Sequence, residues 1–251
     1  MHKTIQKRNY EARTRITELK DLQSWQTAQN HNTIESYSDY VNAYPSGKYA
    51  SIAKQKIKKL KEEKYILPEW NKAKVKNTYK TYSDFYNKYS NSSYASLALK
   101  KMEEAENIDW TKAKRTNTLA SYKKYLANYP NGNYIEEAEE KMIDCEVSAI
   151  MAGNHGNMPP LDRMSYGYGR TSTVEIQNAT NCTLTILYSE TYSKKLIVPS
   201  KKTYSITLTN GKYNVAAKVD CLNVTPFAGS ENLQGGNYSG YYYIETVTYR
   251  Y

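Results

Sequence analysis

The residue types that most often carry out chemistry in proteins are sparse and scattered in this chain. The three histidines, His2, His31 and His155, stand far apart, and no carboxylate motif accompanies them. The segment GYGRTS at 167–172 resembles a phosphate-binding loop only in its glycines, because it lacks the glycine-lysine pair and a preceding apolar strand. No nucleophile with its base and no carboxylate pair is recognisable, so we predict that the protein is not an enzyme.

The three cysteines, Cys145, Cys182 and Cys221, are too widely spaced for a zinc knuckle or a CxxC redox pair. We therefore predict no metal site and no cofactor. Cys182 and Cys221 each lie beside a predicted strand, where they could form a disulfide in an exported protein or stay as buried thiols in a reducing compartment. Cys145 occupies a position of the repeat described below and is predicted to lie in the core.

Aromatic residues offer the best candidates for binding, since Tyr occurs 27 times against two Phe. The segment 223–243, NVTPFAGSENLQGGNYSGYYY, joins a glycine-rich stretch to three consecutive tyrosines. Alternation along a strand must expose at least one of these rings on each face. We take Phe227, Tyr241, Tyr242 and Tyr243 as candidate binding residues; packing against the rest of the protein is the alternative.

The elements that precede these residues form a threefold repeat. Copies begin at Trp25, Trp70 and Trp110, 45 residues apart and then 40. Each contains Trp-x-x-Ala, an Asn-Thr pair, a stripe of large residues at offsets of three, four and seven, a turn, and a Tyr-x-x-x-Ala helix. The stripes are Tyr37, Tyr40, Val41 and Tyr44, then Tyr82, Phe85, Tyr86 and Tyr89, then Tyr122, Tyr125, Leu126 and Tyr129.

These patterns predict helical hairpins that bury their stripes against one another. We expect the Asn of each Asn-Thr pair to be the N-cap of the stripe helix. Pro45-Ser-Gly, Ser90-Asn-Ser and Pro130-Asn-Gly should end that helix, because Pro lacks a donor and Gly or Asn tolerates left-handed geometry. The five extra residues around KYILPEW predict a bend between the first two copies.

The block from about Trp25 to Cys145 resembles tetratricopeptide-like helical repeats, and more closely the YP-x-G-x-Y variety of bacterial envelope assembly lipoproteins. The resemblance implies stacked helical hairpins and a part in an assembly. The copies lack the Leu-Gly pair and the period of about 34 residues of standard tetratricopeptides, so it does not imply their peptide-binding groove.

The remainder of the chain changes to a period of two, which indicates strands. Asn210-Gly211 between two alternating runs predicts a two-residue hairpin, and YYYIETVTY from Tyr241 predicts the last strand. We predict an α+β protein in separate domains: N-terminal α-helical hairpin repeats over 1–150, a linker over 151–171, and an antiparallel Ig-like β-sandwich over 172–251. The last part resembles small C-terminal β-sandwich modules of Bacteroidota-like envelope or secreted proteins, a likeness that implies no activity.

The net charge of +10 is spread along the chain, which argues against nucleic-acid binding. The densest run, Lys54 to Lys64, should point in several directions on a helix and is diluted by Glu62 and Glu63. No apolar run is long enough to span a bilayer, and residues 1–24 hold no signal-peptide core. A removed export signal stays open, and we favour a periplasmic, cell-surface or secreted location over the cytoplasm. The sequence leaves the oligomeric state open.

Together these features predict a non-catalytic protein–protein interaction scaffold or adaptor of a bacterial envelope or secreted assembly, with another protein as partner. The alternative is a carbohydrate- or surface-binding module that uses the aromatic residues of the β-sandwich.

Overall fold

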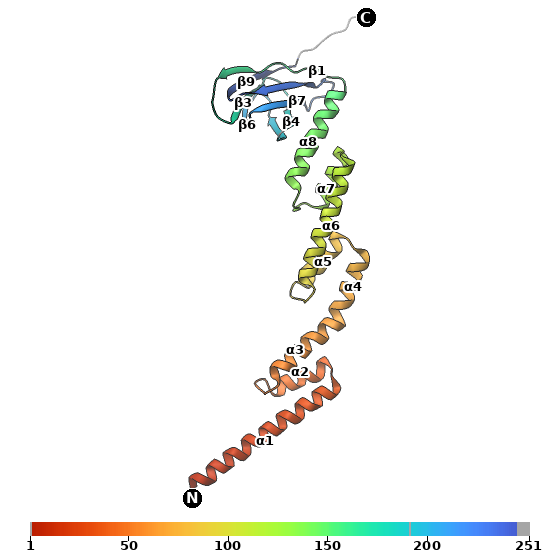
Figure 1. Ribbon diagram of the computed structural model, residues 1–251, viewed down its shortest axis with the longest axis vertical. Coiled ribbons are helices and arrows are strands. Elements are labelled where there is room, and N and C mark those ends of the chain that lie inside the picture. Colours follow the sequence, from red (N-terminus) through yellow and green to blue (C-terminus); the bar gives the residue numbers. More distant parts are fainter. Residues whose placement is uncertain (1, 191, 245–251) are drawn as a thin grey trace. The chain divides into compact units, whose positions relative to one another are not determined.

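A computed structural model describes residues 2–190 and 192–244 of the chain (Figure 1). Helical hairpins come first in the sequence and two packed sheets follow, which confirms the predicted fold class. The chain divides into two compact units, Met1–Ala105 and Glu106–Tyr251. The division falls between the second and third repeats, because helix α8 of the third repeat packs with the sandwich.

The helices of the first two repeats bury the predicted aromatic stripes. In the first repeat Trp25, Ala28, Tyr37 and Tyr40 form one cluster with Ala53, and the second repeat has an equivalent cluster around Trp70. The helices are α1 (His2–His31), α2 (Ile34–Ala43), α3 (Ala50–Lys61), η1 (Glu62–Ile66), α4 (Leu67–Lys76), α5 (Tyr79–Lys88) and α6 (Ala95–Thr116).

Each Trp ring stacks on the Tyr that precedes the last helix of its hairpin. The ring centroids are 5.1 Å apart for Trp25 and Tyr49, and 5.2 Å apart for Trp110 and Tyr134. The small Ala residues of the pattern lie fully buried beside these rings, which lets the helices approach closely. Each copy of the sequence repeat therefore contributes one stacked Trp–Tyr pair to its hairpin.

The Asn-Thr pairs differ from the prediction, because Thr rather than Asn is the N-cap. Thr33, Thr78 and Thr118 each accept a hydrogen bond from the backbone N–H three residues on, in a reciprocal capping box. The preceding Asn residues have left-handed backbones, with φ between 48° and 49°. Each Asn thus ends one helix in the conformation that Asn tolerates best, and the Thr begins the next.

The five extra residues between the first two repeats form a π-helical turn, η1, that continues α3 into α4. The Leu67 N–H donates to the Glu62 carbonyl, five residues back. Pro68 follows in the first turn of α4. Proline has no N–H and its ring collides with the carbonyl four residues before it, and a wider turn accommodates both constraints.

The second unit contains α7 (Leu119–Asn128), α8 (Ile135–Ala152) and a sandwich of two sheets. The five-stranded sheet has the order β1-β8-β7-β4-β5, and the four-stranded sheet has the order β2-β9-β3-β6. Its strands are β1 (Gly156–Asn157), β2 (Asp162–Ser165), β3 (Thr171–Asn178), β4 (Leu184–Glu190), β5 (Lys194–Val198), β6 (Thr203–Thr209), β7 (Gly211–Val219), β8 (Phe227–Leu233) and β9 (Gly236–Tyr242).

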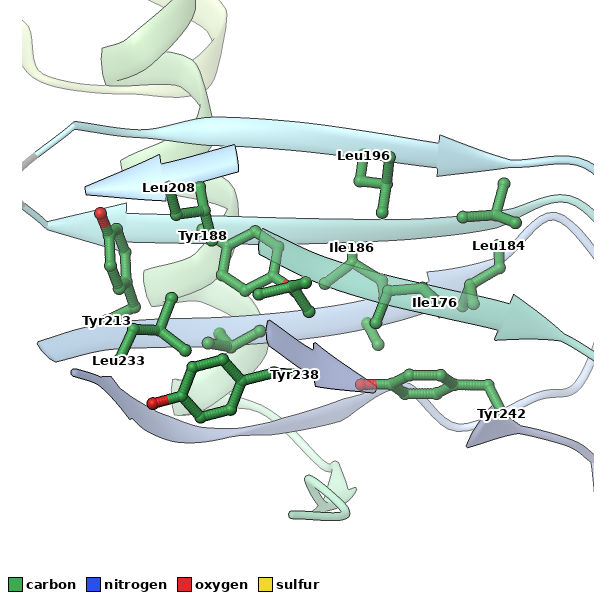
Figure 2. Packing of buried hydrophobic residues seen from close by; sticks show 14 residues of the cluster. Ile176, Leu184, Ile186, Tyr188, Leu196, Leu208, Tyr213, Leu233, Tyr238 and Tyr242 are labelled. Atoms are coloured by element: carbon green, nitrogen blue, oxygen red, sulfur yellow. The ribbon is translucent and has the colours of Figure 1, made fainter. Parts of the chain in front are cut away.

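The core between the sheets follows the predicted alternation. Figure 2 shows Ile176, Ile186 and Tyr188 meeting Tyr238 and Tyr242 within it. Most strand pairs are antiparallel, but β3 pairs with β9 and β1 pairs with β8 in parallel. Strands β1 and β2 arise from the stretch predicted to be a linker. Of the predicted last strand, Tyr241 and Tyr242 belong to β9, and residues 245–249 lie outside the described residues.

The predicted hairpin at Asn210-Gly211 is wrong, because β6 and β7 belong to different sheets. The Asn210 side chain accepts from the Ser172 hydroxyl at 2.8 Å and donates to the Gly169 carbonyl at 2.8 Å. Gly211 has a φ of 151°, outside the range of a type I′ turn. These long-range contacts turn the chain from one sheet to the other.

Helix α8 covers the outer face of the five-stranded sheet (Figure 1). Val147 forms a buried cluster with Leu187 and Ala216, which point away from the sandwich core. The Asp144 carboxylate accepts hydrogen bonds from the hydroxyls of Ser189 and Ser193. Within the described residues, none of the helices is long and apolar enough to cross a membrane.

Candidate functional site

The outer face of the four-stranded sheet is solvent-exposed and rich in hydroxyl and amide groups, and we call its part on β3, β6 and β9 the open face. Strand register places alternate residues of three adjacent strands on it. They are Thr173, Glu175 and Gln177 of β3, Thr203, Ser205 and Thr207 of β6, and Asn237, Ser239 and Tyr241 of β9. Among these nine residues Glu175 is the one carboxylate, and Asp162 of β2, opposite Ser239, adds a second at the edge. The face therefore presents mainly hydroxyl and amide groups.

The four candidate aromatic residues do not form one site. Tyr241 and Tyr243 are each 55% exposed, and their ring centroids lie 6.0 Å apart. Tyr242 turns inward into the sandwich core, where burial raises the pKa of its hydroxyl. Phe227 is half-buried against the same core. The structure thus retains Tyr241 and Tyr243 as an exposed pair next to Gln177, and assigns the other two to packing.

A second exposed aromatic segment escaped the sequence prediction because it lies within the stretch expected to be a linker. Tyr166 is 84% exposed, and its ring centroid lies 4.1 Å from the guanidinium carbon of Arg163. The same guanidinium donates to the Gly235 carbonyl at 2.9 Å. The two Tyr-Gly pairs at 166–169 were the signal that could have marked this segment.

Two of the three cysteines form a disulfide in the sandwich. Cys182 and Cys221 are joined in a disulfide, with their Cα atoms 5.8 Å apart. Asp220 lies beside them, but disulfide sulfurs are not thiolate ligands. Cys145 is a free thiol, half-buried rather than fully in the core, and burial raises its pKa.

The two histidines whose side chains are described, His31 and His155, form hydrogen bonds with backbone carbonyl oxygens. His31 Nδ1 lies 2.8 Å from the Thr27 carbonyl oxygen, and His155 Nδ1 lies 3.0 Å from the Gly156 carbonyl oxygen. Both contacts are to nearby backbone, so these side chains are positioned by local structure.

Tyrosine hydroxyls that donate to carboxylates have the largest pKa shifts among the titratable groups described in the repeats. The Tyr40 hydroxyl donates to Asp21, and burial together with this contact raises the pKa of Tyr40 to about 12. The second oxygen of Asp21 accepts the Lys48 backbone N–H at 2.9 Å. In the third repeat the Tyr125 hydroxyl donates to Glu106 at 2.6 Å in the same way.

The second repeat shows that these contacts are structural. Phe85 and Ile66 occupy the positions of the tyrosine and the carboxylate, and both pack into the hydrophobic cluster. The position held by a turn glycine in the other two repeats is held by Ser92 in the second repeat. A Cβ on Gly47 would lie 2.8 Å from the tyrosine oxygen, and one on Gly132 would lie 2.5 Å from the carboxylate. Neither glycine has a positive φ, so close approach and not left-handed geometry requires them.

Two open grooves of the first unit lie between a helix and the turn that follows the stripe helix. The first-repeat groove, about 780 Å³, runs between α1 and the turn at Tyr44–Tyr49. The second-repeat groove, about 410 Å³, runs between α3 with η1 and the turn at Tyr89–Ser92. The two grooves have equivalent turns but differently charged helix walls, so they are candidate sites for different partners.

Comparisons with known proteins give a family match but no activity. A family model described as a domain of unknown function (DUF6759) matches residues 165–236. These residues run from the end of β2 to the start of β9, and so cover most of the sandwich and none of the helical repeats. A search of curated proteins found no match.

Proposed function

We propose that the protein is a non-catalytic interaction scaffold whose helical repeats dock a partner protein. The observation that carries the proposal is a contrast within the repeats. The positions that hold each hairpin together recur in three copies, whereas the positions that line the grooves change charge between copies. Repeat proteins set their binding specificity in this way, with a constant core and variable surface positions.

The disulfide supports an exported scaffold. Disulfides persist in oxidising compartments such as the periplasm or the cell surface and are rare in the cytosol. The pair Cys182–Cys221 closes a long loop of the sandwich, and its partner cysteines lie at the ends of different strands. A periplasmic, surface or secreted assembly is therefore the setting we propose.

The test is affinity capture with the full chain from an envelope extract, followed by cross-linking and mass spectrometry. We expect a captured protein to be cross-linked to lysines of the repeats, such as Lys54 or Lys88 at the second-repeat groove. Cross-links confined to the sandwich would refute docking by the repeats. Failure of any protein to copurify above a heat-denatured bait would refute the scaffold.

The open face favours a second candidate function, the binding of a neutral glycan. Paired exposed tyrosines beside hydroxyl and amide groups provide the stacking and hydrogen bonding that sugars use. A glycan array with the full chain tests this idea. Tyr241→Ala with Tyr243→Ala should abolish binding, while Tyr192→Ala, at a tyrosine of the same 55% exposure on the β4–β5 connection, should not. An array without hits removes this candidate.

A further inference from the structure

We propose that the second-repeat groove binds an extended acidic segment of a partner protein. This inference rests on the proposed scaffold function and specifies the chemistry of the partner. One wall of the second-repeat groove contains Lys54, Lys58 and Lys61 of α3. Lys88, at the end of α5, lines the other side.

The lysines of this groove are not neutralised by the protein. Within residues 2–190 and 192–244, no ion pair involves Lys54, Lys58 or Lys61. The carboxylate that lines the groove belongs to Glu62, and both of its oxygens accept hydrogen bonds from Ser93, each at 3.0 Å. Glu62 is held by the turn, and the groove lining carries four lysines against this one carboxylate, so its net charge is positive.

The positive charge is particular to this groove. The first-repeat groove is lined by Arg15 and Lys48 but also by Glu18 and Asp21, so its charges balance. Since both repeats fold with the same aromatic core, the lysines of the second groove are not required by the hairpin. The lysine run spreads around its helix as the sequence predicted, and Lys56 and Lys59 do not line the groove. Lys54, Lys58 and Lys61 are spaced four and three residues apart, which places these three on one side.

The floor of the groove adds an apolar surface. Ile57, Ile66 and the ring of Tyr89 are half-buried and line it. The Ser92 hydroxyl is buried and, among the described residues, has no hydrogen-bond partner. This oxygen is closed to solvent, so it does not contribute to binding. The lysines and the apolar floor call for a ligand with carboxylates and one apolar side chain.

An extended peptide meets these requirements. Lys54 and Lys58 are separated by about 6 Å along the helix axis, at a rise of about 1.5 Å per residue. Alternate side chains of an extended strand lie about 6.5 Å apart on one side. A segment with acidic residues at alternate positions can therefore place successive carboxylates beside successive lysines. A volume of about 410 Å³ suits a few side chains and excludes a folded domain.

The experiment measures binding of a fluorescent synthetic peptide to the full chain by anisotropy. In this peptide Glu alternates with Ser around a central Leu, and a second peptide has Gln at every Glu position. We expect the Glu peptide to bind and the Gln peptide to bind at least about tenfold more weakly, because the lysines recognise charge. Lys58→Glu with Lys61→Glu reverses two groove charges and should weaken binding by about tenfold or more.

The matched control is Lys56→Glu with Lys59→Glu, which changes the net charge equally on the same helix outside the groove. It should weaken binding by less than about threefold, because exposed charges away from the groove act through solvent. All four side chains are exposed, and unchanged circular dichroism and unfolding temperatures establish that both variants fold. An equal loss of binding in the two double variants overturns the proposal, since diffuse charge would then explain the affinity.

Two further outcomes also overturn it. One is that the Glu peptide does not bind, and the other is that single-stranded RNA binds more tightly than the peptide and is lost in the groove variant. The scaffold proposal has a separate readout, the protein captured in the cross-linking experiment. If the Lys58→Glu and Lys61→Glu variant still retains that protein through the repeats, the groove inference fails while the scaffold proposal stands.

Discussion

Replacing Gly132 by Ser tests whether the turn glycines serve the buried tyrosine–carboxylate contacts. A Cβ at this position would lie 2.5 Å from Glu106 Oε1, 2.8 Å from the Tyr125 hydroxyl and 2.9 Å from the Cβ of Tyr129. Glu106 is only 4% exposed and cannot move without loss of its hydrogen bond to Tyr125. Overpacking of this kind costs about 1–3 kcal/mol, and we expect Gly132→Ser to destabilise the third repeat by that amount.

The second repeat supplies the compensating background. There, Ser92 is accommodated beside Phe85 and Ile66, which carry no hydroxyl and no carboxylate. Glu106→Ile with Tyr125→Phe removes both partners of this contact, although Asn133 and the Tyr134 N–H lose their acceptors, so the double variant is itself less stable. In that background Gly132→Ser should cost at least about 1 kcal/mol less than in the native chain, a coupling typical of residues in contact.

Hydrogen exchange of the α7 amides measures the free energy of opening of this repeat without assuming that the whole chain unfolds in one step. The four chains of the cycle are the native protein, Gly132→Ser, the double variant and the triple variant. An equal cost of Gly132→Ser in both backgrounds would refute the reasoning, because the clash would then not involve the tyrosine–carboxylate contact.

Three further predictions concern the second unit. Asn117→Ala should destabilise the third repeat by about 1–2 kcal/mol, because Asn117 has a left-handed φ of 48° that Ala adopts only with strain. Asn117→Gly should keep this backbone and lose the 2.8 Å hydrogen bond from the Tyr122 hydroxyl. Urea unfolding compares the two variants. Burial disfavours the charged form of Asp144, but hydrogen bonds from two serines and a lysine outweigh burial and lower the pKa of this carboxyl group. The ionised carboxylate should therefore stabilise the fold fully above the unfolded-state pKa of about 3.9. This stabilisation should disappear as the pH falls through the lower pKa of the folded state. Unfolding temperatures of Asp144→Asn and the native chain should therefore differ at pH 7 and converge in acid, and a constant difference would contradict the argument. Cys182→Ser with Cys221→Ser should cost the sandwich about 3–4 kcal/mol, since the disulfide spans 39 residues of sequence, and an unchanged unfolding midpoint under oxidising conditions would refute this role.

Local periodicity in the sequence identified the repeats and most strands correctly. The offsets of three, four and seven place Tyr37 and Tyr40 on one buried helical face, and alternation places Val174 and Ile176 in the sandwich core. The residues that cap and end individual helices were predicted less accurately. Thr33 rather than Asn32 is the helix cap, and the prediction was wrong because Asn suits both an N-cap and a left-handed helix end, whereas β-branched Thr suits only the cap.

The candidate binding residues illustrate the same limit. Alternation predicted that consecutive tyrosines would point to opposite faces, and Tyr241 and Tyr242 do so. It could not determine which face would be covered, because that depends on strands and helices distant in the sequence. Tyr166 was missed for the corresponding reason, since strand β2 forms only by pairing with β9.

The sequence by itself determined the hairpin repeats, their aromatic stacks and the presence of a β-sandwich, because each of these depends on neighbours a few residues apart. Tertiary structure alone decided that β3 and β9 pair in parallel, that Asn210-Gly211 joins two sheets, and that α8 covers one of them. It also decided that Lys88 completes a groove begun by α3. These features join residues far apart in the chain, and the free energy that selects them comes from packing and hydrogen bonds that no local pattern contains.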